Sequence, residues 1–170
     1  GPLTEDTEAA MLYTSGTTGR PKGCILTNLY FIESGTSYTS LSGQAEMFPD
    51  TERVFNPLPL FHMNALAVTA TGMMIIGGRL VTPDRFHPGS WWQDLAETRA
   101  TVFHYLGVVP PMLLNAPPKP DDRDHNVRFG FGAGVDPKHH ETFEERFGMP
   151  LCECWGMTET GRIYGDVEEP

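Results

Sequence analysis

One short segment of the chain concentrates hydroxyl groups, glycines and two cations. It covers residues 13–23 and reads YTSGTTGRPKG. Its glycines let the backbone approach an anion closely and adopt positive φ angles, so that successive amide N–H groups can point inward. Lys22 adds a movable positive charge and Arg20 adds a planar guanidinium. The pattern predicts a loop that binds a polyphosphate.

Two common phosphate-binding motifs do not fit this spacing. A Walker P-loop has four residues between its glycine and its Gly-Lys-Ser/Thr, whereas Gly16 and Gly19 are three positions apart and a glycine follows Lys22. The dinucleotide fingerprint also differs. A Ser/Thr/Gly turn with a surface lysine is the structural alternative, but turns of this length are uncommon. The predicted nucleotide-binding residues are Thr14, Ser15, Gly16, Thr17, Thr18, Gly19 and Lys22.

A second segment near the end of the chain, residues 154–161, reads CWGMTETG. Trp155 offers a flat aromatic face for a purine, and Gly156 lets such a ring approach the backbone. Thr158 can donate to a phosphoryl oxygen, and Glu159 is a hard oxygen ligand suited to Mg²⁺. The structural alternative is a strand end with a packed tryptophan and a surface glutamate.

Both segments resemble motifs of the adenylate-forming superfamily, which includes acyl-CoA synthetases, firefly-type luciferases and peptide-synthetase adenylation domains. Residues 14–23 follow its Thr-Ser-Gly-Thr-Thr-Gly-x-Pro-Lys-Gly loop. Residues 155–159 follow its aromatic-Gly-x-Thr-Glu motif, with tryptophan at a position that is usually tyrosine. Two such motifs in the expected order favour the resemblance over two chance turns.

The resemblance implies a two-step reaction that uses ATP, Mg²⁺ and coenzyme A. A small-molecule carboxylate attacks the α-phosphorus of ATP to give an acyl-adenylate, and a thiol then displaces AMP. Lys22, Thr158 and Glu159 would be catalytic, with Glu159 as the Mg²⁺ ligand. The second motif would contact the nucleotide through Cys154, Trp155, Gly156, Met157 and Thr158.

Two further segments resemble the same superfamily less closely. Gly132, Ala133 and Gly134 correspond to its Gly-Gly-Ala-Pro segment, which lines the adenine and acyl pocket; a glycine-rich strand-to-helix turn explains these residues about as well. His62 lies in a Pro-Leu-Phe-His segment that resembles the Pro-x-Phe-His of the superfamily, where the imidazole lies near the acyl carboxylate. A packed or surface histidine is the alternative.

A zinc site is a possible alternative use of several cysteines and histidines. Cys152 and Cys154 alternate on one predicted strand, and His139 and His140 are adjacent on one predicted helix. This arrangement lacks the usual spacing of zinc ligands. We therefore expect no zinc site.

The composition excludes several classes of protein. A chain of 170 residues with 39% apolar residues can bury the core of one domain. A net charge of −10 disfavours a nucleic-acid-binding surface, and the apolar runs are too short to span a membrane. Three cysteines and no export signal favour a cytoplasmic location, and the sequence carries no signature of an oligomeric state.

The segments between the motifs alternate between strand and helix patterns. Strands are predicted over residues 9–13, 24–26, 53–58, 79–81, 101–106, 127–131 and 151–155. Helices are predicted over residues 28–42, 65–76, 88–99, 108–115 and 137–147. This alternation predicts an α/β fold with a mostly parallel sheet, helices on both faces, and ligands beyond the carboxyl ends of the strands. The first strand is apolar throughout, which is typical of a buried parallel strand.

The resemblance implies that residues 1–170 are part of the large N-terminal adenylation domain, with the start of that domain and the C-terminal lid domain outside the chain. The ribose-binding aspartate and the catalytic lysine of the superfamily would also lie outside it, so the isolated chain is expected to be inactive. Residues 143–148 and 164–166 look most like the carnitine/crotonobetaine type of CoA ligase. Alternatives are a nucleotide-binding fragment without catalysis, a luciferase-like enzyme, or an adenylation domain that serves a carrier protein.

Overall fold

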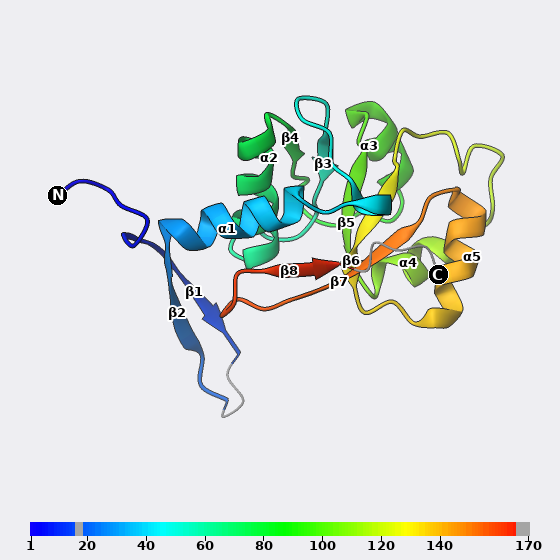
Figure 1. The fold of residues 1–170 in the computed structure, drawn as a ribbon. Helices are drawn as coiled ribbons and strands as arrows, with labels where there is room; N and C mark the ends of the chain where they lie inside the picture. Colours follow the sequence, from blue (N-terminus) through cyan, green and yellow to red (C-terminus); the bar gives the residue numbers. More distant parts are fainter. Residues whose placement is uncertain (16–18, 166–170) are drawn as a thin grey trace.

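The structure is a computed structural model that describes residues 1–15 and 19–165 (Figure 1). Its strands are β1 (Glu8–Thr14), β2 (Lys22–Thr27), β3 (Arg53–Phe55), β4 (Arg79–Val81), β5 (Val102–Leu106), β6 (Phe129–Ala133), β7 (Leu151–Gly156) and β8 (Ile163–Gly165). Its helices are α1 (Asn28–Thr39), α2 (Thr71–Ile76), α3 (Trp91–Thr98), α4 (Val109–Leu114) and α5 (Pro137–Phe147). A 3-10 turn, η1 (Gly43–Ala45), and a π-helix, η2 (Asn64–Ala70), complete the described elements.

The larger sheet has six strands in the order β4-β3-β5-β6-β7-β8. All neighbouring pairs in it are parallel except β7 and β8, which are antiparallel. The structure therefore confirms the predicted mostly parallel sheet. The prediction missed β8, because a three-residue strand is too short to show a periodic pattern.

The sheet is covered by helices on both faces, as predicted. Successive side chains of a strand point to opposite faces, so Val102 packs into one apolar cluster and its neighbour Phe103 into the other. The first cluster includes Tyr38 of α1 and Met73 of α2. The second includes Trp91 of α3, whose ring makes an edge contact with Phe103 at 5.4 Å between centroids. Figure 1 shows α1 and α2 on one side of the molecule and α3, α4 and α5 on the other.

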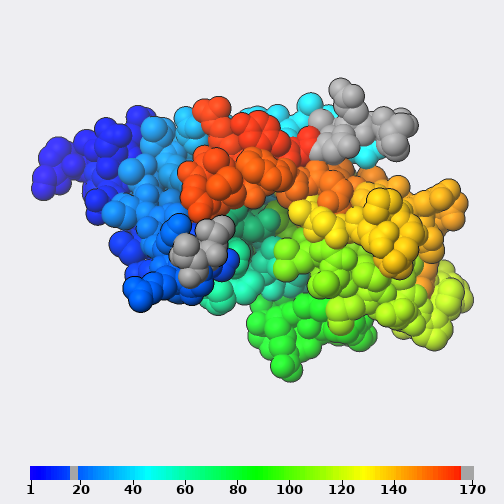
Figure 2. All heavy atoms as spheres, turned by 90° about the horizontal axis from the view of Figure 1, so that it is seen from below, coloured from blue at the N-terminus to red at the C-terminus, as the bar shows by residue number. Residues whose placement is uncertain are grey.

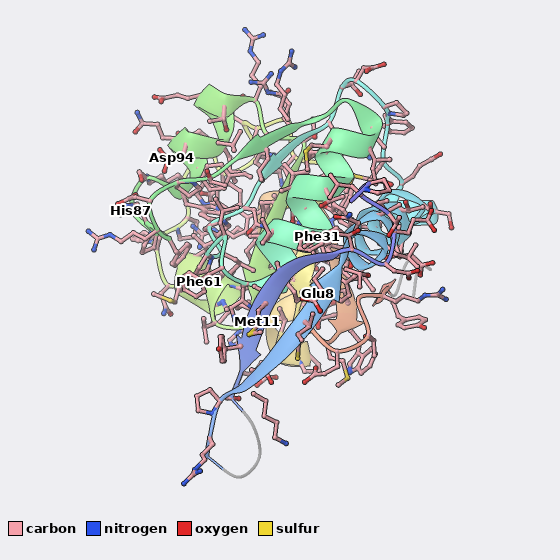
Figure 3. All side chains as sticks on the ribbon, turned by 90° about the vertical axis from the view of Figure 1, so that its left-hand side faces the viewer. Glu8, Met11, Phe31, Phe61, His87 and Asp94 are labelled. Carbon is pink, nitrogen blue, oxygen red and sulfur yellow. The ribbon has the colours of Figure 1, made fainter. Side chains whose placement is uncertain are left out.

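The strand predicted over residues 9–13 differs from expectation. We expected a buried parallel strand, but β1 pairs with β2 as an antiparallel two-stranded hairpin. Residues 15–21 join the two strands directly, and a parallel pair would need a much longer crossover. The hairpin is buried only on one face, because Leu12 is 9% exposed whereas Met11 is 51% exposed (Figure 3). The segment that the sequence predicts to bind phosphate therefore connects the two strands of this hairpin.

The cap of helix α1 is Thr27, whose side chain accepts a hydrogen bond from the backbone N–H of Tyr30 at 3.3 Å. It ends at Thr39, earlier than the predicted end near residue 42. Gly35 lies where α1 packs against α2. A Cβ atom at Gly35 would lie 2.8 Å from the backbone nitrogen of Gly72. The glycine therefore permits close packing of the two helices.

The predicted helix over residues 65–76 is continuous but changes type along its length. Its first part is the π-helix η2, and its second part is α2, which ends at Gly77 with a φ angle of +69°. The prediction for residues 137–147 matches α5 in both bounds, with Asp136 as the cap. Within the described residues, no helix has both the length and the apolar character that crossing a bilayer requires.

Candidate nucleotide-binding site

The two motifs meet at one hydrogen bond. The hydroxyl of Thr14 donates to Oε1 of Glu159 at 3.5 Å, although the two residues are 145 positions apart. Thr14 is the last residue of β1, and Lys22 is its partner in the hairpin register. Figure 2 shows the orange segment after β7 beside the blue hairpin on one face of the molecule. The end of the hairpin and the second motif thus lie side by side.

The described part of the hairpin connection is exposed to solvent. Ser15, Gly19 and Lys22 are all exposed, and Gly19 has a φ angle of +80°, which favours glycine. Gly16, Thr17 and Thr18, which were predicted to bind phosphate, lie outside the described residues. The exposed ammonium of Lys22 is available to an anion that approaches the end of the hairpin.

A tight turn after β7 carries Thr158 and Glu159. The backbone N–H groups of Thr160 and Gly161 both donate to the carbonyl of Met157, at 3.1 and 3.3 Å. Gly161 has a φ angle of +66°, and a Cβ atom there would lie 2.6 Å from the ring of Tyr30. The turn can therefore pack closely on α1 and leave the Glu159 side chain exposed at the hairpin.

Trp155 lies near the end of β7 and is 56% exposed. Its ring is 6.0 Å from that of Tyr164 on β8, at an angle of 43°. The exposed part of the indole is available for a planar ring to stack on. Met157 is also exposed, whereas Cys154 is half-buried, and burial, with Glu153 and Cys152, raises the pKa of its thiol to about 12. The Cys154 thiol is therefore neutral at neutral pH.

Glu153 organises the glycine-rich turn after β6. Its Oε2 atom accepts a hydrogen bond from the N–H of Gly134 at 2.7 Å, and its Oε1 atom accepts from the N–H of Val135 at 3.3 Å. The hydroxyl of Tyr105 donates to the same carboxylate at 3.0 Å. Burial, followed by the charge of Glu153, raises the pKa of Tyr105 well above its usual value. Gly134 itself has a φ angle of +82°.

Sequence reasoning missed Glu153. The available signal was a carboxylate within the apolar strand pattern of residues 151–155, because a half-buried charge needs hydrogen-bond donors. The structure brings those donors from the end of β6, which pairs with β7. Of the predicted residues Gly132, Ala133 and Gly134, Gly132 is opposite Glu153 in the strand register and Gly134 is hydrogen-bonded to its carboxylate.

His62 lies apart from the hairpin and the second motif. It follows β3, whose carboxyl end shares an edge of the sheet with those of the parallel strands β6 and β7. Its side chain is exposed, and its ring lies 6.3 Å from that of the exposed Phe61. Among the described residues, no side-chain hydrogen bond or ring contact joins His62 to the two motifs.

The carboxylates of the site suit a nucleotide-bound Mg²⁺ better than a metal bound by protein alone. In the described ranges, no three His, Cys, Asp or Glu side chains are grouped to hold a metal ion. Mg²⁺ in nucleotide sites commonly takes one or two carboxylates and completes its coordination with phosphate oxygens and water. Glu159 can supply such a carboxylate, because its side chain is exposed and shares only a long hydrogen bond with Thr14.

These features define a nucleotide-binding α/β enzyme domain: a Gly/Thr-rich hairpin connection, an exposed indole and a carboxylate at the carboxyl edge of a mostly parallel sheet. The AMP-binding enzyme family matches residues 1–168, and the chain belongs to this family.

Curated relatives include CoA ligases and fatty acid transport proteins. The chain is 38% identical over 161 residues to sulfoacetate–CoA ligase of Cupriavidus necator, a match that covers 94% of the chain and 30% of that protein. It is 34% identical over 149 residues to long-chain fatty acid transport protein 3 of Homo sapiens, covering 87% of the chain and 21% of that protein. The chain thus spans less than a third of the length of either relative.

A solved structure with the same fold is O-succinylbenzoate coenzyme A synthetase from Bacillus subtilis, determined in complex with AMP. The TM-score is 0.76 and the sequence identity 25%, and the match covers 98% of this chain and 34% of that one. The same enzyme has also been solved with ATP and a magnesium ion, with a TM-score of 0.75.

Proposed function

We propose that the natural polypeptide that includes this chain is an ATP-dependent carboxylate–CoA ligase, and that residues 1–170 are part of its adenylation domain. The observation that carries this proposal is the contact between Thr14 and Glu159, which joins the phosphate-loop hairpin to the aromatic-Gly-x-Thr-Glu turn. The ligase relatives and the nucleotide-bound synthetase support the same reaction class. In the first step, a carboxylate oxygen bonds to the α-phosphorus and pyrophosphate leaves. In the second, a thiol bonds to the acyl carbon and AMP leaves.

Some residues of the site interact with the charged phosphates and Mg²⁺, and others contact the adenine ring. Lys22 and the amides of the hairpin connection bind the phosphates, and Thr158 donates to a phosphoryl oxygen. Glu159 holds Mg²⁺, which when bound neutralises charge on the phosphate oxygens. Trp155 stacks on the adenine, and the turn around Gly134 lines the other side of that ring.

The acyl group is assigned to the region near His62, because His62 follows β3 at the same edge of the sheet. Coenzyme A is the proposed thiol. A cytoplasmic location is also proposed, because Cys24 and Cys154 are free thiols and a reducing compartment keeps thiols in that state. The carboxylate itself is left to experiment, with carnitine-type, sulfonated and fatty acids as the first candidates.

The test is carboxylate-dependent exchange of labelled pyrophosphate into ATP by the natural polypeptide that includes this chain. The panel contains sulfoacetate, fatty acids of increasing length, carnitine and crotonobetaine, followed by a thioester assay with CoA. Exchange that requires one carboxylate, and thioester formation with CoA, are the expected results. ATP binding without exchange by any carboxylate would indicate a nucleotide-binding protein without catalysis. Exchange without thioester formation would indicate a different acyl acceptor.

A further inference from the structure

A network of polar side chains lies inside the core beneath the π-helix. It joins α1, the end of β3, η2 and β5. Its members are Tyr38, Asn56, Asn64, Thr69 and His104. All except Asn64 are 0% exposed. Because buried polar groups are costly unless they are hydrogen-bonded, such a network holds its elements in one arrangement.

The hydrogen bonds fix the direction of every donor. The Oδ1 atom of Asn56 accepts from the N–H of Leu58 at 2.9 Å, so its amide nitrogen donates to Oδ1 of Asn64, also at 2.9 Å. Asn64 Oδ1 is therefore an acceptor, and Nδ1 of His104, 2.8 Å away, carries the hydrogen. Burial lowers the pKa of His104 to about 3, so the imidazole is neutral, and its Nε2 atom accepts from the hydroxyl of Tyr38 at 2.7 Å.

The same network fastens both ends of the π-helix. The Asn56 amide nitrogen also donates to the hydroxyl of Thr69 at 2.9 Å, and that hydroxyl donates to the backbone carbonyl of Asn64 at 2.8 Å. Asn64 and Thr69 are five positions apart, which is the spacing of the backbone hydrogen bonds in a π-helix. The side chains therefore reinforce the wide register between the first and sixth residues of η2.

The turn that contains His62 is hydrogen-bonded to the start of η2, so the geometry of η2 influences the orientation of this turn. The carbonyl of His62 accepts from the N–H of Leu66 inside η2 at 3.0 Å, and the N–H of His62 donates to the carbonyl of Pro59 at 2.9 Å. Each residue of an α-helix advances the chain by about 100° around the helix axis. If η2 changed from π-helical to α-helical hydrogen bonding, its turn would contain one residue fewer, and His62 would rotate around the helix axis by about that angle. Within the described residues, the ring of His62 contacts one other ring, that of Phe61.

We propose that Asn56, Asn64, Thr69 and His104 are positioning residues that hold the π register of η2 and thereby direct His62 toward the acyl substrate. This proposal rests on the proposed ligase function, because it assumes that the carboxylate binds near His62. A merely structural network would affect stability and both substrates alike, whereas a positioning network affects the carboxylate selectively.

Two threonines of the same helix provide a matched pair of variants. Thr69→Val removes the hydroxyl that links Asn56 to the Asn64 carbonyl, at nearly constant volume. Thr71→Val removes a buried hydroxyl whose acceptor, the carbonyl of Leu66, is also five positions earlier, but this bond is long at 3.4 Å. Among the described residues, the Thr71 hydroxyl has no hydrogen bond to Asn56 or His104. Thr69→Ser keeps the network hydroxyl and serves as the rescue variant.

The experiment measures KM for the carboxylate and for ATP in the natural polypeptide that includes this chain, with unfolding curves for every variant. We expect Thr69→Val to raise the KM of the carboxylate about tenfold, the effect of one lost hydrogen bond in a network. Its KM for ATP should stay within about twofold of wild type, as should both constants of Thr71→Val and Thr69→Ser. Equal KM changes for Thr69→Val and Thr71→Val, or equal rises for both substrates, would overturn the proposal.

A spectroscopic measurement separates this proposal from the proposed function. With ¹³C-labelled histidine in the same polypeptide, Thr69→Val should shift the His62 imidazole signals, and Thr71→Val should leave them in place. If the wild-type protein shows no carboxylate-dependent exchange, the ligase proposal fails, while the imidazole shifts still test whether the network orients His62. Unshifted His62 signals in folded Thr69→Val protein would refute the positioning role.

Discussion

The hydroxyl of Thr14 lies 3.5 Å from the carboxylate of Glu159 and joins the end of β1 to the turn after β7. This distance exceeds the ~2.5–3.0 Å that is usual for an O–H···O hydrogen bond, so the contact is weak. The carboxylate therefore keeps most of its capacity to bind a cation. Because Lys22 pairs with Thr14 across the hairpin, one cation and one carboxylate lie on either side of the same threonine.

Glu159→Gln should increase the Mg²⁺ concentration needed for half-maximal pyrophosphate exchange. The amide keeps the size of the side chain and its bond to Thr14 but removes one negative charge from the proposed metal site. We expect a shift of about tenfold or more, because hydrogen-bonded charges typically contribute more than 1.4 kcal/mol. The measurement is a Mg²⁺ titration at fixed ATP. Superimposable titration curves for wild type and variant would exclude Glu159 as the ligand.

Lys22→Ala should reduce pyrophosphate exchange on the order of 100-fold, because a positioned charge on a reacting phosphate is commonly worth that much in rate. Stability should stay within about 0.5 kcal/mol, since the side chain is exposed. Lys138→Ala is the matched control, because Lys138 pairs with Asp136 on the surface at 2.8 Å. If both variants lose the same activity, the phosphate role of Lys22 is wrong.

The local features of the fold could be predicted from local sequence. The cap at Thr27 and both bounds of α5 follow from hydrogen-bonding side chains, proline and glycine at helix ends. The prediction for β1 is wrong because the apolar run of residues 9–13 is typical of a buried parallel strand, whereas the short connection to β2 requires an antiparallel hairpin. The connection length alone excludes a parallel pair.

The long-range polar contacts could not be predicted in the same way. Glu153 and Gly134 are 19 positions apart, and Asn64 and His104 are 40 positions apart. Neither pair has a spacing pattern in sequence, because each contact is created by the order of strands in the sheet. The proximity of the two main motifs followed from their resemblance to a known family, and the structure adds the particular atoms that meet.

Glu153→Ala should lower the free energy of unfolding by about 1–3 kcal/mol, because it leaves the amides of Gly134 and Val135 without their acceptor. It should also raise the KM for ATP, since the turn it holds lines the proposed adenine site. Chemical denaturation and exchange kinetics measure the two effects. Glu141→Ala, on the exposed face of α5, is the control and should change neither quantity.

Glu153→Gln refines this test. The glutamine oxygen can accept one of the two amide hydrogen bonds, whereas its NH₂ group would face the other donor. We expect a loss of stability that is smaller than that of Glu153→Ala but still measurable. A Glu153→Gln variant as unstable as Glu153→Ala would mean that the charge, rather than the number of acceptors, holds the turn.

The stability of the protein should decrease in mild acid because of His104. Burial lowers the pKa of His104 to about 3, whereas an unfolded histidine titrates near about 6.5. Between these values the unfolded chain binds a proton that the folded protein does not, so stability is retained above about pH 6.5 and lost as the pH falls. The slope should reach about 1.4 kcal/mol per pH unit for this one group. Urea unfolding between pH 4.5 and pH 7.5 measures it.

The contribution of His104 can be separated from that of the other histidines. His104→Gln should be less stable than wild type at pH 7, because it disturbs the bonds to Tyr38 and Asn64, but its stability should depend less on pH. The half-buried His125 also has a pKa lowered by burial, so His125→Gln should flatten the curve to a smaller extent. If His104→Gln keeps the full wild-type slope between pH 4.5 and 6.5, another group carries the acid sensitivity and the neutral, buried imidazole does not.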